Sequence, residues 1–206
     1  MDAKENEKEI KVILLGDSGV GKTCIINRYI NDEFNPNSKT TLGSNASSKV
    51  IKRGQVSYIL NLWDTTGQEK YHSITNLFIK GSNIVILVYA INSLSSFEGL
   101  DFWYKSVQEK LEGENYVLAV VGSKSDLIEE EEEVVSEEEA KKFAKEKNAI
   151  FKLVSSKEDP EGINNLFDTL LDELIKNDYL MENKSYVINR RNHRDVKKEK
   201  KKKNCC

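Results

Sequence analysis

The stretch "IKVILLGDSGVGKT", residues 10–23, carries the strongest indication of the fold. Its first half is a continuous apolar run of the kind found in buried strands, and its second half matches the pattern GxxxxGK[ST] just before a helical pattern. Glycines in such a turn let backbone N–H groups face a bound phosphate, and the dipole of the following helix adds to the attraction. The stretch predicts a strand–loop–helix unit that binds a nucleotide phosphate, but it does not indicate which base the nucleotide carries.

The pattern also predicts roles for single residues of this loop. Lys22 is expected to reach the β- and γ-phosphates, and the Thr23 hydroxyl is expected to bind Mg²⁺. The other residues predicted at the nucleotide are Asp17, Ser18, Gly19, Val20, Gly21 and Cys24. Cys24 keeps a second interpretation, because a free cysteine on a helix commonly behaves as a small core residue.

Apolar runs and amphipathic patterns alternate along the rest of the chain. Strands are predicted at 10–16, 84–90, 116–122 and 149–155, helices at 95–111, 136–147 and 161–176, and a hairpin that turns at Arg53-Gly54-Gln55. This alternation predicts an α/β fold with a mostly parallel six-stranded sheet and helices on both faces. Ligands of such sheets lie beyond the carboxyl ends of the strands, so the site is expected in the loops after residues 15, 63, 122 and 154.

The segment "LNLWDTTGQEKY" (60–71) adds a second group of candidates. Asp64 stands at the end of an apolar strand, where a carboxylate can hold Mg²⁺ through water. Gly67 offers an N–H free of any side chain to a γ-phosphate, and Gln68 can orient a water because its amide both donates and accepts. The segment predicts the hydrolytic part of the site, with Gln68 and Lys22 as catalytic residues.

The segment "VVGSKSDL" (120–127) differs by one residue from a guanine-recognition loop. That loop has Asn where this chain has Ser123, whereas Lys124 and Asp126 match it. On the residues alone, the segment is either a guanine site with one altered member or a coincidence in a chain rich in lysine and serine.

With "GDSGVGKT", "WDTTGQE" and "SKSD" in this order, the chain resembles a small GTPase of the Ras superfamily, and the Rab branch fits best. "WDTTGQEKYHS" is near the Rab form WDTAGQERYHS, and "VYAINSLSSF" resembles VYDITNxxSF. The similarity runs from about residue 10 to residue 176 and returns in the final Cys-Cys. "YHSI" and "TLGSNASSK" lean towards the endosomal Rabs.

The resemblance implies how the base is bound. Phe34 matches the aromatic residue beside the guanine, and Lys124 lays its stem over the base. Asp126 carries the discrimination, because its carboxylate accepts from both guanine N1–H and the 2-amino group, which adenine lacks. The family's Asn bonds guanine N7, and the shorter Ser123 is expected to reach the base only through a water.

Further residues follow from the same resemblance. Thr41, in "KTTLG", matches the switch I threonine that completes Mg²⁺ coordination and senses the γ-phosphate. "VSSK" (154–157) matches the TSAK loop, in which backbone N–H groups contact guanine O6, so Ser155, Ser156 and Lys157 join the nucleotide-binding residues.

Besides position 123, three positions depart from the family pattern. Thr66 replaces Ala beside the γ-phosphate glycine, and Ala90 replaces the usual Asp of "VYD". Ala46 stands where Rabs carry the switch I Phe that packs with Trp63 and Phe78 in the surface that effectors recognise. Atypical effectors are therefore expected, although Trp63 and Phe78 also fit a plain core role.

The charges divide the chain into an acidic body and a basic tail. Residues 190–206 hold nine Lys/Arg and two Asp/Glu, a net charge of +7, whereas the whole chain is at −3. An acidic body argues against nucleic-acid binding, and the tail is expected to meet an anionic membrane. Cys205 and Cys206 resemble the Rab double-prenylation signal. The predicted parts are a flexible N-terminus (1–9), a GTP-binding domain (10–177) and a disordered hypervariable tail (178–206).

Other bulk properties narrow the class of protein. No run of about 18 apolar residues spans a membrane, the charged N-terminus is not a secretory signal, and three cysteines make no disulfide framework. A cytosolic setting is expected, on the cytoplasmic face of an endosomal or other vesicular membrane and in exchange with the cytosol.

The leading expectation is a monomeric molecular switch that binds GTP and GDP with Mg²⁺, hydrolyses GTP slowly and regulates vesicle trafficking. The family implies an exchange factor, a GTPase-activating protein, a prenylation escort and a GDP-dissociation inhibitor as partners. Two alternatives stay open. One is a divergent pseudo-GTPase scaffold that binds nucleotide weakly and does not cycle, and the other is a P-loop kinase for a small molecule.

Overall fold

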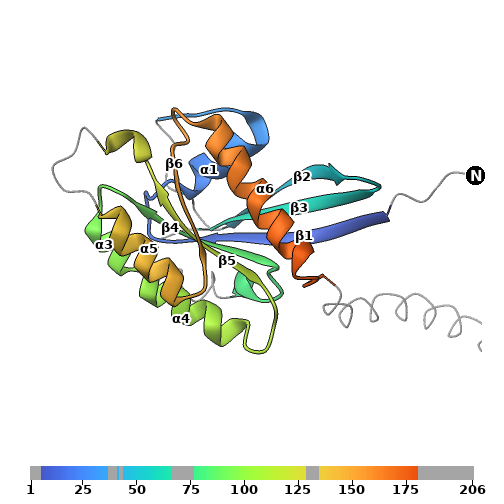
Figure 1. Ribbon diagram of the computed structural model, residues 1–206. Coiled ribbons are helices and arrows are strands. Elements are labelled where there is room, and N and C mark those ends of the chain that lie inside the picture. The colour runs from blue at the N-terminus through green and yellow to red at the C-terminus, as the bar shows by residue number, and fades with distance from the viewer. Residues whose placement is uncertain (1–5, 37–40, 42–43, 66–76, 129–134, 181–206) are drawn as a thin grey trace, which may run out of the picture.

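The computed structural model describes residues 6–36, 41, 44–65, 77–128 and 135–180. A six-stranded sheet with the strand order β2-β3-β1-β4-β5-β6 forms its centre (Figure 1). Its strands are β1 (Asn6–Leu15), β2 (Ser44–Arg53), β3 (Val56–Thr65), β4 (Ile84–Ala90), β5 (Val117–Ser123) and β6 (Ile150–Val154). All neighbouring strands are parallel except the β2–β3 hairpin, which confirms the predicted mostly parallel sheet.

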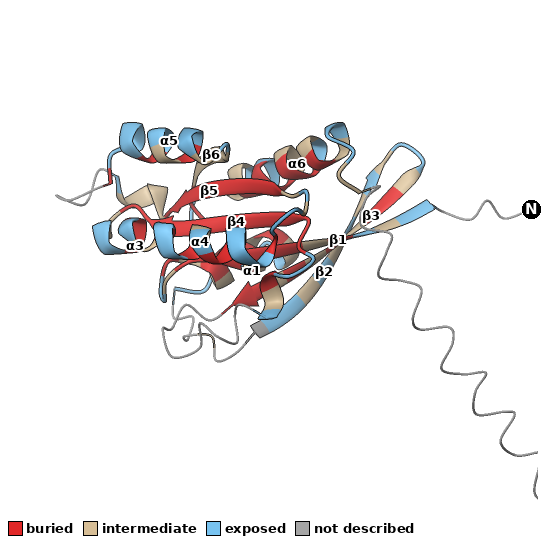
Figure 2. Ribbon diagram, turned by 90° about the horizontal axis from the view of Figure 1, so that it is seen from below, coloured by how far each residue is buried: buried red, intermediate tan, exposed pale blue. Residues whose placement is uncertain are grey.

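Helices cover both faces of the sheet. Helices α1 (Lys22–Asn31) and α6 (Pro160–Lys176) pack on one face, and α3 (Leu94–Glu98), α4 (Leu100–Lys110) and α5 (Glu137–Glu146) pack on the other. Two apolar cores result, one on each side of β4 and β5. These two strands are buried at every residue (Figure 2), as their continuous apolar sequences predict.

Strand β1 begins at Asn6, four residues before the predicted strand. Its first residues pair with β3, from Asn6 opposite Val56, and they are mostly exposed. Backbone pairing with the hairpin therefore extends this strand beyond its apolar run, and hydrophobicity carries no sign of the extension.

The single helix predicted over 95–111 is divided at Gly99 into α3 and α4. A Cβ atom on Gly99 would lie 2.9 Å from Asp17 Oδ2, so the helix surface approaches the loop after β1 closely at this point. In the same place, Trp103 Nε1 donates a hydrogen bond of 3.0 Å to Asp17 Oδ1. The break thus lies where a carboxylate from the loop after β1 occupies the surface of the helical segment.

The last two helices begin at side-chain caps. Ser136 accepts a hydrogen bond from Glu139 N at 3.4 Å before α5, and this spacing of a serine and a glutamate three residues later is the capping-box pattern. Asp159 accepts from Gly162 N at 2.8 Å before α6, whose first residue is Pro160.

Some predictions fall on residues outside the described ranges. They concern Thr66, Gly67 and Gln68, and the tail with Cys205 and Cys206. Within the part of the chain that is described, no helix has the length and apolar character needed to cross a membrane.

Candidate nucleotide-binding site

The loops after β1, β5 and β6 and the end of β3 meet at the carboxyl ends of these strands around a cavity of about 350 Å³, the size of a small-molecule site. Its lining residues are Ser18, Gly19, Gly21, Lys22, Thr23, Cys24, Phe34, Asn35, Pro36, Thr41, Thr65, Ser123, Lys124, Asp126, Leu127, Ser156 and Lys157. Most residues predicted at a nucleotide are therefore brought together here.

Four further predicted residues lie directly behind this lining, because each bonds to a lining residue. They are Asp17, Val20, Asp64 and Ser155. Asp17 shows the pattern well: its carbonyl accepts from Lys22, whereas its carboxylate turns away to Trp103.

Lys22 lies at the bottom of the loop after β1, with 5% of its surface exposed. Its Nζ donates hydrogen bonds of 2.7 Å to the carbonyl oxygens of Gly16 and Asp17. Burial lowers the pKa of Lys22 to about 8, against the opposing attraction of Asp64 and Asp17. Because an ammonium has three donors, one N–H is left for a ligand oxygen.

The loop requires glycine at its first position. Gly16 has a φ of +144°, and a Cβ atom there would lie 2.1 Å from the Val88 carbonyl oxygen of the neighbouring strand β4. Any side chain at this position would force the loop away from the sheet.

Three oxygen-bearing side chains converge beside Lys22. Thr23 Oγ1 and Thr41 Oγ1 donate to Asp64 Oδ2 at 2.8 and 3.2 Å, and the two hydroxyl oxygens lie 2.8 Å apart. Asp64 is 6% exposed, and its Oδ1 has no hydrogen-bond partner among the described residues. Burial raises the pKa of Asp64, while the hydrogen bond from Thr23 and the charge of Lys22 lower it. Hydroxyl and carboxylate oxygens are ligands that suit Mg²⁺, so the set fits this ion.

Ser123, at the end of β5, bonds to the protein rather than facing the cavity with a free hydroxyl. Its Oγ lies 2.5 Å from the Val20 carbonyl oxygen and 2.9 Å from the Tyr89 carbonyl oxygen, and the residue is 3% exposed. One hydroxyl proton serves both acceptors. The side chain predicted to reach a base through water thus ties the end of β5 to the loop after β1.

The end of the cavity where the sequence predicts the base, called the base end below, is built around Asp126. Its Oδ1 accepts a 2.6 Å hydrogen bond from Ser155 Oγ, and its Oδ2 lies 3.8 Å from Lys157 Nζ. Lys124 precedes the 3₁₀ turn η2 (Ser125–Leu127) with a left-handed φ of 62°, and it lines the cavity together with Phe34. These contacts bring the loops after β5 and β6 together at a carboxylate.

A separate feature lies on the hairpin. The rings of Trp63 and Phe78 stack with centroids 5.2 Å apart, and Ala46 pairs directly with Trp63 across β2 and β3. Both rings are half-buried against the core, so they combine packing with exposure. Ala90, by contrast, is only 2% exposed.

Sequence reasoning missed Arg28 of α1. Its Nε donates to the Ser156 carbonyl at 2.7 Å, across 128 positions of sequence. No local pattern signals this contact, because only the fold brings α1 beside the loop after β6.

Comparisons with known proteins agree with this arrangement. The Ras family model matches residues 11–176. The chain is 36% identical over 169 residues to Ras-related protein SEC4 of Saccharomyces cerevisiae. The aligned residues cover 82% of this chain and 76% of that protein. It is 37% identical over 166 residues to Ras-related protein Rab-17 of Mus musculus (81% and 76%) and 33% identical over 170 residues to Ras-related protein Rab7 of Pisum sativum (81% and 82%). The resemblance seen in the motifs is confirmed, and the chain belongs to the Ras family of small GTPases, in its Rab branch.

Proposed function

We propose that the chain binds GTP and GDP in the cavity together with Mg²⁺ and acts as a switch in vesicle trafficking from a lipid-anchored position on a membrane. The observation that supports this most is the Asp64 carboxylate. One oxygen accepts from Thr23 and Thr41, while the other is buried and has no hydrogen-bond partner within the described ranges. A buried unpaired carboxylate oxygen is costly, and a hard cation or its bound water would satisfy it.

Thr23, Thr41 and Asp64 would hold the ion, with Asp64 acting directly or through water. A bound Mg²⁺ supplies neutralisation of the charge on the phosphates. Lys22 contributes a second positive charge, held in place by two backbone carbonyls. Gln68, which lies outside the described residues, is proposed to orient the attacking water. Catalysis is thus electrostatic and positional.

Intrinsic turnover is proposed to be slow. No arginine occurs in the three nucleotide motifs of the sequence, so no side chain there can act as an arginine finger. A GTPase-activating protein would supply one, and such a residue raises turnover by about 10³- to 10⁵-fold.

The switch would operate through Thr41 and Gly67. With GTP bound, the γ-phosphate and the ion hold both loops, and hydrolysis removes those contacts. Thr41 is connected to the candidate metal ligands Thr23 and Asp64, so its position depends on them. The other partners proposed are an exchange factor, a prenylation escort and a GDP-dissociation inhibitor. Effectors are proposed to be atypical, because Ala46 lies opposite Trp63.

The tail would place this switch on the cytoplasmic face of an intracellular membrane. Prenylation of Cys205 and Cys206 would give stable anchoring where one lipid gives only marginal binding. Lysines of the sequence "KKEKKKKN" would add about 1 kcal/mol each near an anionic leaflet. Return to the cytosol would require that a partner cover the lipids.

The nucleotide retained by the purified protein tests the proposal most simply. We expect chromatography of the denatured protein to show close to one guanine nucleotide per chain, released faster after chelation of Mg²⁺. The same preparation should convert GTP to GDP slowly. A retained adenine nucleotide would favour a small-molecule kinase, and absence of any nucleotide would favour a scaffold.

A further inference from the structure

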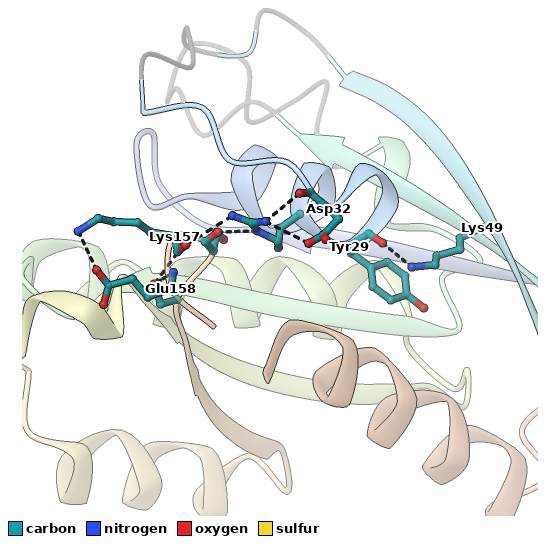
Figure 3. A network of polar contacts seen from close by, with 8 residues as sticks. Tyr29, Asp32, Lys49, Lys157 and Glu158 are labelled. Carbon is teal, nitrogen blue, oxygen red and sulfur yellow. Dashed lines mark hydrogen bonds and ion pairs between the residues drawn. The ribbon is translucent and has the colours of Figure 1, made fainter. Parts of the chain in front are cut away.

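Arg28 bonds to both walls of the base end of the cavity. Its side chain is 12% exposed, and its Nη1 donates to the Asp32 carbonyl at 2.8 Å and to Asp32 Oδ1 at 3.0 Å. On its other side, Nε donates to the Ser156 carbonyl at 2.7 Å. Figure 3 shows Asp32 at the end of α1 on one side of this network, with Lys157 and Glu158 on the other. One guanidinium therefore connects the end of α1 to the loop after β6.

On the loop side, Arg28 and Ser155 hold the same two peptide units from opposite edges. The Ser156 carbonyl and the Lys157 N–H form one planar unit, and the Lys157 carbonyl and the Glu158 N–H form the next. Arg28 donates to both carbonyls, at 2.7 and 3.5 Å. Ser155 Oγ accepts from both N–H groups, at 3.2 and 3.0 Å. Because the carbonyl and N–H of a unit point in opposite directions, these bonds fix the orientation of the loop backbone.

The same network continues to Asp126. Ser155 Oγ donates its one proton to Asp126 Oδ1 at 2.6 Å while its lone pairs accept from the loop backbone. The Asp126 side chain is 9% exposed. The orientation of this carboxylate therefore depends on the loop that Arg28 holds.

On the helix side, Arg28 caps the carbonyl end of α1, where a positive charge is favoured. Asp32 follows the helix with a left-handed φ of 55°, and two residues later the chain reaches Phe34, which lines the cavity. The wall that carries Phe34 and the wall that carries Ser156 and Lys157 thus depend on one side chain.

We infer that Arg28 is a positioning residue for base selection, which sets the two walls of the base end and holds Asp126 through Ser155. This inference rests on the proposed function, in which Asp126 selects guanine. Arg28 itself does not line the cavity, so its effect is indirect. Because the network does not include the phosphate contacts of Lys22, the effect should be confined to ligands that carry a base.

Two variants and a matched control test this role. Arg28→Met keeps an apolar stem and removes every donor. Arg28→Lys keeps the positive charge and can still donate to one of the acceptors. Lys49→Met is the control, because Lys49 also donates to a carbonyl at the end of α1, that of Tyr29, and packs over the Tyr29 ring. Figure 3 shows Lys49 and Lys157 at opposite ends of the network. Affinities for GDP, ADP and inorganic tripolyphosphate are measured by calorimetry, and GDP release by stopped flow.

For Arg28→Met we expect GDP release at least about tenfold faster and a preference for GDP over ADP reduced about as much, the loss expected for one charge-assisted hydrogen bond. Tripolyphosphate affinity should stay within about twofold, Arg28→Lys should show a smaller loss, and Lys49→Met should keep the base preference. Unchanged GDP release in a folded Arg28→Met, or an equal loss for tripolyphosphate, would overturn the inference alone. A parent protein that binds GDP no better than ADP would overturn the proposed function as well.

Discussion

At the phosphate end of the cavity the motif residues bond mainly to one another, whereas at the base end the motif residues also depend on Arg28, which lies outside the motifs. Lys22 donates to carbonyls of its own loop, and Thr23 bonds to Asp64. Asp126, by contrast, depends on Ser155, whose loop depends on Arg28 of a distant helix.

Because of this difference, we expect the two ends to respond differently to substitutions. At the base end Ser123 stands where the family has Asn, and its hydroxyl ties β5 to the Val20 carbonyl. We expect the substitution to remove a contact to the base. At the phosphate end, Lys22 and Thr23 bond within the loop after β1 and to Asp64, so we expect substitution of either residue to weaken binding strongly.

The largest effect is expected for Lys22→Ala. The variant loses the buried ammonium and its bonds to phosphate oxygens, at about 1.5–3 kcal/mol for each charge-assisted bond. Affinity for GDP should fall by roughly 10²- to 10⁴-fold, with tripolyphosphate affected as strongly. Calorimetry with both ligands checks this. If Lys22→Ala lost its affinity for GDP but kept its affinity for tripolyphosphate, Lys22 would not act on the phosphates, which would contradict this account.

The next effect concerns pH. Burial lowers the pKa of Lys22 to about 8 in the ligand-free protein, so the ammonium loses its proton as pH rises through that value. Bound phosphates favour the charged form, so binding above about pH 8 requires proton uptake and GDP affinity should fall by up to about tenfold per pH unit. Calorimetry in buffers of different ionisation enthalpy measures this uptake. A flat affinity profile without proton uptake would mean that Lys22 stays charged.

A smaller effect is expected for Ser123→Asn. An amide can donate to the Val20 carbonyl and still offer a further polar group, whereas the serine hydroxyl has a single proton. One added hydrogen bond of about 0.5–1.5 kcal/mol should tighten GDP binding roughly twofold to tenfold and slow its release. Stopped-flow release of labelled GDP is the measurement, with Ser123→Ala as the opposite control. If both variants release GDP like the parent, residue 123 has no part in retention.

The smallest effect on binding is expected for Trp103→Phe. It removes the N–H that donates to the Asp17 carboxylate, and a hydrogen bond to a charged group contributes about 1.5–3 kcal/mol to the unfolding free energy. GDP affinity should change by less than about threefold, because Lys22 is held by the carbonyl of Asp17 and not by its carboxylate. Urea unfolding and calorimetry separate the two readouts. Asp17→Asn, which keeps an acceptor oxygen, should lose less stability.

Much of the fold is predictable because its signals are local. The apolar runs of β4 and β5 and the glycine pattern around Lys22 each indicate their structure within about ten residues. The capping box at Ser136 also lies within four residues. The contact of Asp17 with the segment at Gly99 is not predictable in this way, since Asp17 comes from another loop.

In the candidate site, too, some features follow from local motifs and others only from the fold. Lys22, Thr23 and Asp64 were predicted from motifs, and the structure brings them together. The acceptors of the Ser123 hydroxyl lie 103 and 34 positions away in the sequence, and that of Arg28 Nε lies 128 positions away. No spacing rule connects such residues, so which groups these side chains bond to is known only from the fold.

The most direct test of a working guanine site is calorimetry of GDP and ADP with the nucleotide-free parent and with Asp126→Asn. The Asp126 carboxylate can accept two hydrogen bonds from guanine, each worth about 1.5–3 kcal/mol, and none of the same kind from adenine. We expect the parent to prefer GDP by at least about 10²-fold and Asp126→Asn to lose that preference. Equal affinity of the parent for GDP and ADP, or no binding of either, would contradict a guanine site at the loops after β5 and β6.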